Sequence, residues 1–121
     1  MDNSSGALGE DYAAGFLKNK GYIIIERNYR SRFGEIDVIA ADSKYIVFVE
    51  VKTRSPECMV SPFEAVTRAK QLKIIKTAAC YLQKNPCRLQ PRFDVMGVTA
   101  GGGKVFSAEY LENAFGCGSF G

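Results

Sequence analysis

The segment 35–54, with the sequence EIDVIAADSKYIVFVEVKTR, contains two runs rich in isoleucine and valine around a short polar stretch. Two such runs joined by a two-residue loop are typical of a β-hairpin, and Ser43-Lys44 is the expected loop. This register places Asp37 directly opposite Glu50. A slip of one residue would turn every side chain to the other face, so the apolar pattern specifies the register.

Four charged side chains share one face of the predicted hairpin, because side chains alternate between two faces along a strand. Two apolar residues join them, and the set is Glu35, Asp37, Ile39, Phe48, Glu50 and Lys52. The other face is entirely apolar and is expected to form core: Ile36, Val38, Ala40, Val47, Val49 and Val51. Glu35 is expected opposite Lys52, as a cross-strand ion pair.

The pairing of Asp37 with Glu50 is unfavourable, since like charges directly opposite destabilise a sheet and close carboxylates resist ionising together. A divalent cation is the simplest compensation, because hard cations such as Mg²⁺ often take one or two carboxylates as ligands. Lys52 would then stand beside the cation and could orient a water or stabilise negative charge. The alternative is an exposed face with ordinary ion pairs, and spacing alone leaves both interpretations open.

The chain contains no histidine. This excludes Ser-His-Asp and Cys-His catalysis and zinc sites with histidine ligands. The four cysteines form no C-x-x-C pair and are expected to be reduced thiols: Cys58, Cys80, Cys87 and Cys117. No signal sequence or membrane-spanning run is visible, so we expect a cytoplasmic protein without a membrane partner.

Basic residues are unevenly distributed along a chain of net charge +3. Between Ala65 and Phe93 there are seven and no acid: Arg68, Lys70, Lys73, Lys76, Lys84, Arg88 and Arg92. A second group consists of Arg27, Arg30 and Arg32. Such clusters can neutralise the phosphates of a nucleic acid, although a solvated helix face is the commoner reason for a charge run.

Periodicity predicts seven elements in the order α-β-β-β-α-β-β. They are a helix at 6–19, strands at 22–29, 35–42 and 45–53, a helix at 63–84, a strand at 92–100 and a weaker strand at 104–109. A long helix between strands implies a crossover to a parallel strand, and hence an α/β sandwich with a mixed sheet. We expect one domain spanning 1–121, with loose ends at about 1–6 and 116–121.

Helical spacing also predicts which side chains face the sheet. In the helix 63–84 the predicted buried stripe is Ala65, Ala69, Leu72, Ile75, Ala79 and Leu82, with the lysines off it. In the helix 6–19, Glu10 shares the inward face with Ala13 and Ala14. An acid near a helix start is commonly favoured by the macrodipole, but Glu10 could also reach the acid pair.

The stretches GEIDVIA and VFVEVKTR resemble the D…(D/E)-x-K signature of the PD-(D/E)XK nuclease superfamily, which has the restriction-endonuclease-like fold. A longer ordered set resembles the YraN family, an uncharacterised protein family (UPF family 0102), from about Gly9 to Phe115. The stretches that carry it are GEDYAAGFLKNKGY, ERNYRSRFGEIDVIA, VFVEVKTR, EAVTRAKQLKIIKTAACYL and RFDV. The layout is also similar to the archaeal Holliday-junction resolvases. One departure is Ile36, which stands where the superfamily motif has proline.

This resemblance implies a three-layer sandwich and a Mg²⁺- or Mn²⁺-dependent nuclease acting on DNA, with branched DNA in repair or recombination as one substrate. The implied catalytic residues are Asp37, Glu50 and Lys52, and the implied metal ligands are Asp37, Glu50, the Val51 carbonyl and Glu10. In this hypothesis the basic residues that would contact the nucleic-acid backbone are Arg30, Arg32, Arg54, Lys70 and Lys73. Cleavage of a junction would require a homodimer. The alternative is a non-catalytic nucleic-acid-binding or repair-complex module on the same fold.

Overall fold

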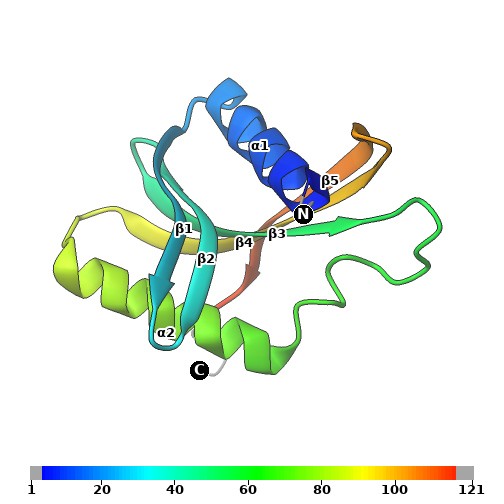
Figure 1. Ribbon diagram of the computed structural model, residues 1–121. Helices are drawn as coiled ribbons and strands as arrows, with labels where there is room; N and C mark the ends of the chain where they lie inside the picture. Colours follow the sequence, from blue (N-terminus) through cyan, green and yellow to red (C-terminus); the bar gives the residue numbers. More distant parts are fainter. Residues whose placement is uncertain (1–3, 117–121) are drawn as a thin grey trace.

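A computed structural model describes residues 4–116 of the chain, and its elements follow the predicted order (Figure 1). They are α1 (Ser4–Asn19), β1 (Ile23–Ser31), β2 (Gly34–Ala41), β3 (Tyr45–Arg54), α2 (Arg68–Lys84), β4 (Gln90–Gly101) and β5 (Lys104–Phe115). The second helix starts later than predicted, and the last strand is longer. Helix α1 includes part of the segment 1–6 that was expected to be loose, whereas residues 1–3 and 117–121 lie outside the described residues.

The five strands form one mixed sheet in the order β1-β2-β3-β4-β5. All neighbours are antiparallel except β3 and β4, which are parallel and joined by the crossover through α2. Helix α1 covers one face of the sheet and α2 covers the other (Figure 1). The prediction of a restriction-endonuclease-like three-layer sandwich with a mixed sheet is therefore confirmed.

Buried side chains form two clusters, one on each side of the sheet. The cluster beneath α2 contains Ile36, Ile39, Ile46, Phe48, Val66, Ile74, Ala78, Tyr81, Phe93 and Val95. The cluster beneath α1 contains Ala13, Leu17, Val38, Ala40, Val47, Val49, Met96, Val98 and Ala100. Ile36 was predicted on the face of Val38, and this was wrong: alternation is interrupted between them, where Asn28 of β1 has a positive φ of 54° and leaves Asp37 out of the β1–β2 ladder.

The predicted stripe of α2 is correct only in part: Ile75 and Leu82 are partly buried against the cluster beneath α2, but the other four residues are not. The buried residues are Ile74, Thr77, Ala78 and Tyr81, whereas Ala65, Ala69, Leu72 and Ala79 are exposed. Thr77 tolerates burial because its hydroxyl donates to the Lys73 carbonyl (2.8 Å) and lies 3.1 Å from the Ser31 hydroxyl. The ring of Tyr81 packs edge-on against Tyr29, with ring centroids 5.1 Å apart. The buried side of α2 therefore includes a hydroxyl group with hydrogen-bond partners and an aromatic ring, where the pattern predicted small aliphatic residues.

Gly9 lets α1 approach the sheet closely. A Cβ atom at this position would lie 2.0 Å from the Thr53 hydroxyl oxygen of β3, a distance that atoms do not adopt without a shift. The absence of a side chain therefore brings the first turns of α1 against β3, and Glu10 with them.

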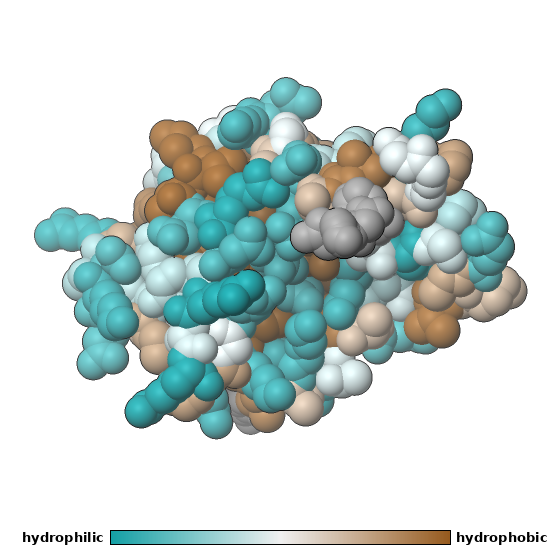
Figure 2. All heavy atoms as spheres, viewed as in Figure 1, coloured by the Kyte–Doolittle hydropathy of each residue, from teal (hydrophilic) through white to brown (hydrophobic). Residues whose placement is uncertain are grey.

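Other sequence predictions concern the environment of the protein. No helix within residues 4–116 is long and apolar enough to cross a membrane. Three of the four cysteines are described, and all three are free thiols: Cys58, Cys80 and Cys87. The fourth, Cys117, lies outside the described residues. Figure 2 shows that much of the surface over the β1–β2 hairpin is hydrophilic, in keeping with its sequence ERNYRSRFGE.

Candidate functional site

Strands β2 and β3 pair in the predicted register near their connecting turn. The Asp42 carboxylate fixes this turn by accepting from the backbone N–H groups of Lys44 (2.8 Å) and Tyr45 (2.7 Å). The ladder then runs from Ala41 opposite Ile46 to Val38 opposite Val49 at its far end. The register argued from the two-residue loop is therefore confirmed over these four pairs.

Beyond Val38 and Val49 the sheet divides. Strand β2 continues beside β1 as far as Gly34, while β3 continues beside β4 as far as Arg54. The hairpin of β1 and β2 and the pair of β3 and β4 then run in different directions (Figure 1). We call this point, between residues 35–37 of β2 and 50–52 of β3, the fork.

Asp37 and Glu50 are the first residues of each strand inside the fork. We predicted that they form a ladder pair, and this was wrong, because the ladder ends at Val38 and Val49. Instead of a backbone carbonyl of β2, the Asp37 side chain accepts the hydrogen bond from β3. Its Oδ2 atom accepts a hydrogen bond from the Val51 N–H at 2.8 Å. The two acids still interact, since the charge of Glu50 acts on the titration of Asp37.

The predicted pairing of Glu35 with Lys52 is wrong. Within the fork Glu35 stands opposite Arg30 of β1, with 3.0 Å between Glu35 Oε1 and Arg30 Nε. Lys52 turns instead to its neighbour on β3, and its Nζ atom lies 3.7 Å from Glu50 Oε2. The change follows from the division of the sheet, because β2 is no longer beside β3 at these positions.

Both acids of the fork are buried, with 7% of Asp37 and 4% of Glu50 exposed. Burial, followed by the charge of Glu50, raises the pKa of Asp37 to about 7, although the hydrogen bond from Val51 opposes the rise. The charges of Glu10 and Glu35 add to it. The fork therefore holds a carboxylate that ionises near neutral pH, a property that is concentrated at functional sites.

Two lysines share the Glu50 carboxylate. Lys70 of α2 places its Nζ atom 3.0 Å from Glu50 Oε2, closer than Lys52 at 3.7 Å. Burial and the charge of Lys70 lower the pKa of Lys52. Burial also acts to lower the pKa of Lys70, but the hydrogen bond and charge of Glu50 outweigh it, so that pKa is raised. The sequence interpretation placed Lys70 off the buried stripe and missed this contact.

Glu10 lies on α1, and its charge contributes to the raised pKa of Asp37. Its side chain is 23% exposed, and Glu10 Oε1 lies 3.9 Å from the Nη2 atom of Arg27. The same Arg27 atom donates to Asp11 at 2.8 Å. Among residues 4–116 no three Asp, Glu or Cys side chains gather closely enough to hold a metal ion. A cation at the fork would therefore depend first on Asp37 and Glu50.

Two shallow grooves flank the turn of the β1–β2 hairpin. The groove toward α2 has a volume of about 470 Å³ and is lined by Gly34, Glu35, Thr67, Ala69, Lys70, Lys73 and Ile74. The groove toward α1 has a volume of about 460 Å³ and is lined by Gly6, Ala7, Glu10, Arg27, Asn28, Arg30 and Glu35. Both grooves carry basic residues, and both are lined by Glu35, which belongs to the fork.

The residues predicted to hold a nucleic-acid backbone have different surroundings. Lys73 and Arg30 line the grooves, and Arg32 is exposed with its guanidinium 5.0 Å from the centre of the Phe33 ring. Arg54 is engaged within the protein, because it donates to the Val60 carbonyl and to the Thr99 hydroxyl. It therefore secures the loop that follows β3.

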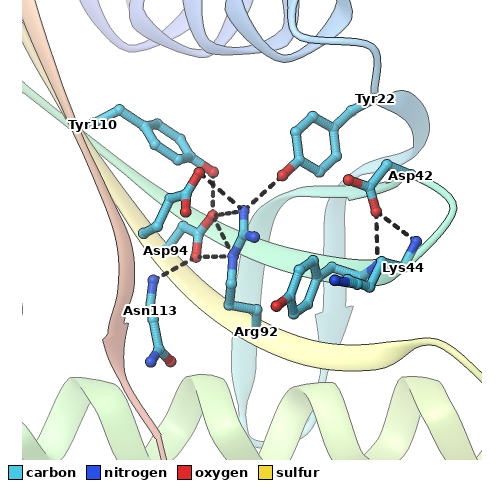
Figure 3. A network of polar contacts seen from close by, with 9 residues as sticks. Tyr22, Asp42, Lys44, Arg92, Asp94, Tyr110 and Asn113 are labelled. Carbon is cyan, nitrogen blue, oxygen red and sulfur yellow. Dashed lines mark hydrogen bonds and ion pairs between the residues drawn. The ribbon is translucent and has the colours of Figure 1, made fainter.

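Arg92, the last member of the basic run, belongs to a buried cluster that sequence reasoning missed (Figure 3). The Asp94 carboxylate accepts from Arg92 Nε (3.0 Å) and Nη2 (2.8 Å), from the Asn113 N–H (2.9 Å) and from the Tyr110 hydroxyl. Arg92 Nη2 also donates to the Tyr22 hydroxyl at 2.7 Å. The hydrogen bond to Asp94 raises the pKa of Arg92. The sequence signal was the alternation RFD, which puts both charges on one face.

Comparison with known proteins gives one consistent result. The model of the uncharacterised protein family UPF0102 matches residues 9–98. A UPF0102 protein from Clostridium botulinum (strain Loch Maree / Type A3) is 47% identical over 113 residues, covering 91% of this chain and 92% of its own. A UPF0102 protein from Dictyoglomus thermophilum is 45% identical over 118 residues, covering 95% of this chain and 100% of its own.

Proposed function

We propose that this chain, which belongs to the uncharacterised protein family UPF0102, is a metal-dependent nuclease that hydrolyses phosphodiester bonds in DNA. The proposal has two supports. One is the resemblance of GEIDVIA and VFVEVKTR to the PD-(D/E)XK signature. The other is the geometry of the fork, where two acids and two lysines meet between grooves that carry basic residues.

The observation that carries the proposal is the buried acid pair. Asp37 and Glu50 are almost fully buried, and burial and mutual repulsion raise the pKa of Asp37 to about 7. Burying two neighbouring acids costs stability unless a cation compensates them. Two carboxylates at the fork suit Mg²⁺ or Mn²⁺, because these ions take oxygen ligands and often need only one or two carboxylates.

In the proposed site Asp37 and Glu50 would hold the divalent cation, with the Val51 carbonyl as a further oxygen donor and Glu10 adding negative charge from α1. When bound, the cation supplies a nucleophilic water at neutral pH and neutralises charge on the scissile phosphate. Lys52 orients that water and stabilises the charge that develops on the phosphate oxygens. The reduced pKa of Lys52 fits a role in proton positioning.

The two grooves hold the nucleic-acid backbone on either side of the scissile phosphate. Lys73 contributes a positive charge from the α2 side and Arg30 from the α1 side, with Arg32 at the hairpin turn. Contacts of this kind position the backbone but do not read its sequence. We therefore expect a nuclease with little sequence preference.

The test is cleavage of a panel of labelled DNAs, linear and branched, with Mg²⁺ or Mn²⁺. We expect at least one substrate to be cut, and a chelator to stop the reaction. Lys52→Ala should lower the rate by about a hundredfold or more while DNA binding persists. Lys44→Ala is the matched control, because Lys44 is an exposed lysine at the other end of β3. Equal rates in the two variants, or no cleavage by the parent, would contradict the proposal.

A non-catalytic nucleic-acid-binding module is the second candidate. The observation in its favour is the run of basic residues from Arg68 to Arg88, which contains no acid and lies mostly on α2. It predicts salt-dependent binding of DNA by the parent without cleavage of any substrate, with or without Mn²⁺. The same panel therefore separates the two candidates.

A further inference from the structure

Lys70 occupies a place in α2 that the fold directs toward the sheet. It precedes Ile74 by four residues and Thr77 by seven, and both of these side chains are buried beneath the helix. The start of the helix is fixed by Thr67, whose side chain accepts from the Lys70 N–H at 3.3 Å. Lys70 therefore lies in the first turn of α2, on the side that faces Glu50.

A lysine is unfavourable in this place unless it has a partner. The N-terminus of a helix carries partial positive charge, which opposes a cation in the first turn, and the first turn of α2 contains no acid. The partner is Glu50, whose Oε2 atom lies 3.0 Å from Lys70 Nζ. Only 5% of the Glu50 side chain is exposed, so the lysine compensates a buried charge.

Lys70 and Lys52 both contact the Glu50 carboxylate, but their side chains differ in exposure to solvent. The Lys70 side chain is 42% exposed and borders the groove toward α2, whereas the Lys52 side chain is 28% exposed. Asp37, Glu50 and the two lysines balance in formal charge. A divalent cation added to this set would repel both ammonium groups, and the more exposed one can move out.

We propose that Lys70 is a built-in counter-ion of the acid pair, which holds Glu50 when no divalent cation is bound and moves to the groove toward α2 when one is. There it contacts a backbone phosphate beside Lys73. This inference rests on the proposed function, because it takes the fork as a cation site. It adds that binding of the cation and binding of the nucleic acid strengthen each other, since each favours the same position of Lys70.

The direct test is the affinity of the protein for Mn²⁺, measured by calorimetry without nucleic acid. Lys70→Gln should bind Mn²⁺ at least about fivefold more tightly than the parent. This factor corresponds to the repulsion between two unit charges about 4 Å apart in bulk water, which is the weakest case. Lys70→Arg keeps the charge and should resemble the parent. Lys73→Gln is the matched control, because Lys73 is exposed on the same helix and makes no ion pair with Glu50.

A second readout needs no metal. Without divalent cations, Lys70→Gln should melt at a lower temperature than Lys73→Gln, because only Lys70 compensates Glu50. A third readout is DNA affinity in a Lys52→Ala background, which Mg²⁺ should increase more when Lys70 is present than after Lys70→Gln. This background retains both acids, and slow cleavage leaves the complex intact for measurement.

The outcomes separate this inference from the proposed function. Equal Mn²⁺ affinities in the parent and Lys70→Gln would overturn the role of Lys70 and leave the nuclease proposal standing. No Mn²⁺ binding by the parent or by Lys70→Gln, at millimolar metal, would overturn both. Tighter binding after Lys70→Gln, with Lys73→Gln and Lys70→Arg unchanged, would support the exchange of counter-ions.

Discussion

Two clusters of buried charge lie on this sheet, and they are compensated in opposite ways. On β4, Asp94 is 0% exposed and meets a matching set of donors from Arg92, Tyr110 and Asn113. At the fork, Asp37 has one backbone donor, Val51, and a like charge beside it. We call the first cluster closed, because both oxygens of the Asp94 carboxylate accept hydrogen bonds from within the protein. The second is open.

The difference indicates what each cluster does. A closed cluster of this kind contributes to the specificity of the fold, because each buried group loses a partner if the packing changes. In the open cluster the acids lack such a set of donors, and they are compensated by the ammonium groups of Lys52 and Lys70, both partly exposed. Burial of charge is common to both clusters, and the completeness of its partners is what differs between the structural cluster and the candidate site.

The largest effect is expected in the closed cluster. Asp94→Asn leaves the Arg92 guanidinium without its buried counter-charge, with only the exposed Glu112 near it, and should lower the free energy of unfolding by about 3–5 kcal/mol. Chemical denaturation measures it. Glu112→Gln is the control, since this acid lies 3.8 Å from Arg92 Nη2 with 62% of its side chain exposed, and it should change little. Equal losses in the two variants would mean that the cluster is not closed in solution.

The open cluster should respond to pH in the opposite direction from an ordinary carboxylate. The pKa of Asp37 is about 7 in the folded protein, against 3.8 for an aspartate side chain free in water, so the folded state binds the extra proton between these values. Without metal, the contribution of Asp37 to stability should therefore rise as the pH falls from about 7 to 4. Asp37→Asn should be more stable than the parent at pH 8, by about 1–3 kcal/mol, and similar to it at pH 4.

Denaturation curves across this pH range measure the effect, and Mg²⁺ supplies the control. Added Mg²⁺ should stabilise the parent more than Asp37→Asn, because a ligand that binds only the native state stabilises it by mass action. A variant that is less stable than the parent at pH 8 without metal would assign Asp37 to a structural ion pair.

The open cluster also depends on how closely α1 approaches β3. Gly9→Ala would place a methyl group against the Thr53 hydroxyl and should cost about 1–2 kcal/mol. Gly15→Ala is the control on the same helix, where no atom lies within 4 Å of the added carbon. It should stabilise by about 0.5–1 kcal/mol. If the overlap is the cause, Thr53→Ala combined with Gly9→Ala should recover most of the loss.

The sequence predicted the neighbourhood of the open cluster but not its shape. The short turn after Asp42 determines the register, and the register alone brings Asp37 close to Glu50. Alternation could not predict the fork, because the division depends on β2 staying with β1 while β3 stays with β4. Which strands stay together is determined by pairing between residues distant in the sequence. Because β2 stays with β1, Glu35 pairs with Arg30.

The contacts made by α2 were harder to predict. Aliphatic residues at helical spacing favoured one stripe, yet the buried side includes Thr77, which has hydroxyl partners, and Tyr81, which packs on aromatic rings. Turning the helix to this side is what brings Lys70 to Glu50. Residues so distant in the sequence meet only through the crossover of α2, which local patterns do not specify.

The smallest expected effect distinguishes two lysines on one helix. For duplex DNA each phosphate contact contributes roughly −0.9 to the slope of log K against log salt. Lys73→Gln should therefore flatten the slope by about one unit with or without Mg²⁺, if its exposed ammonium contacts a phosphate. Lys70→Gln should flatten it only with Mg²⁺, because without metal this ammonium is held by Glu50.

Fluorescence anisotropy across a salt series measures these slopes, with a Lys52→Ala background to suppress cleavage in the presence of Mg²⁺. Several unrelated DNA sequences should give the same changes, since charge contacts to phosphates carry no base information. A slope that Lys70→Gln lowers equally in both conditions would place this lysine on the DNA at all times. The open cluster would then be compensated by Lys52 alone, and the contrast with the closed cluster of Asp94 would be sharper than the structure indicates.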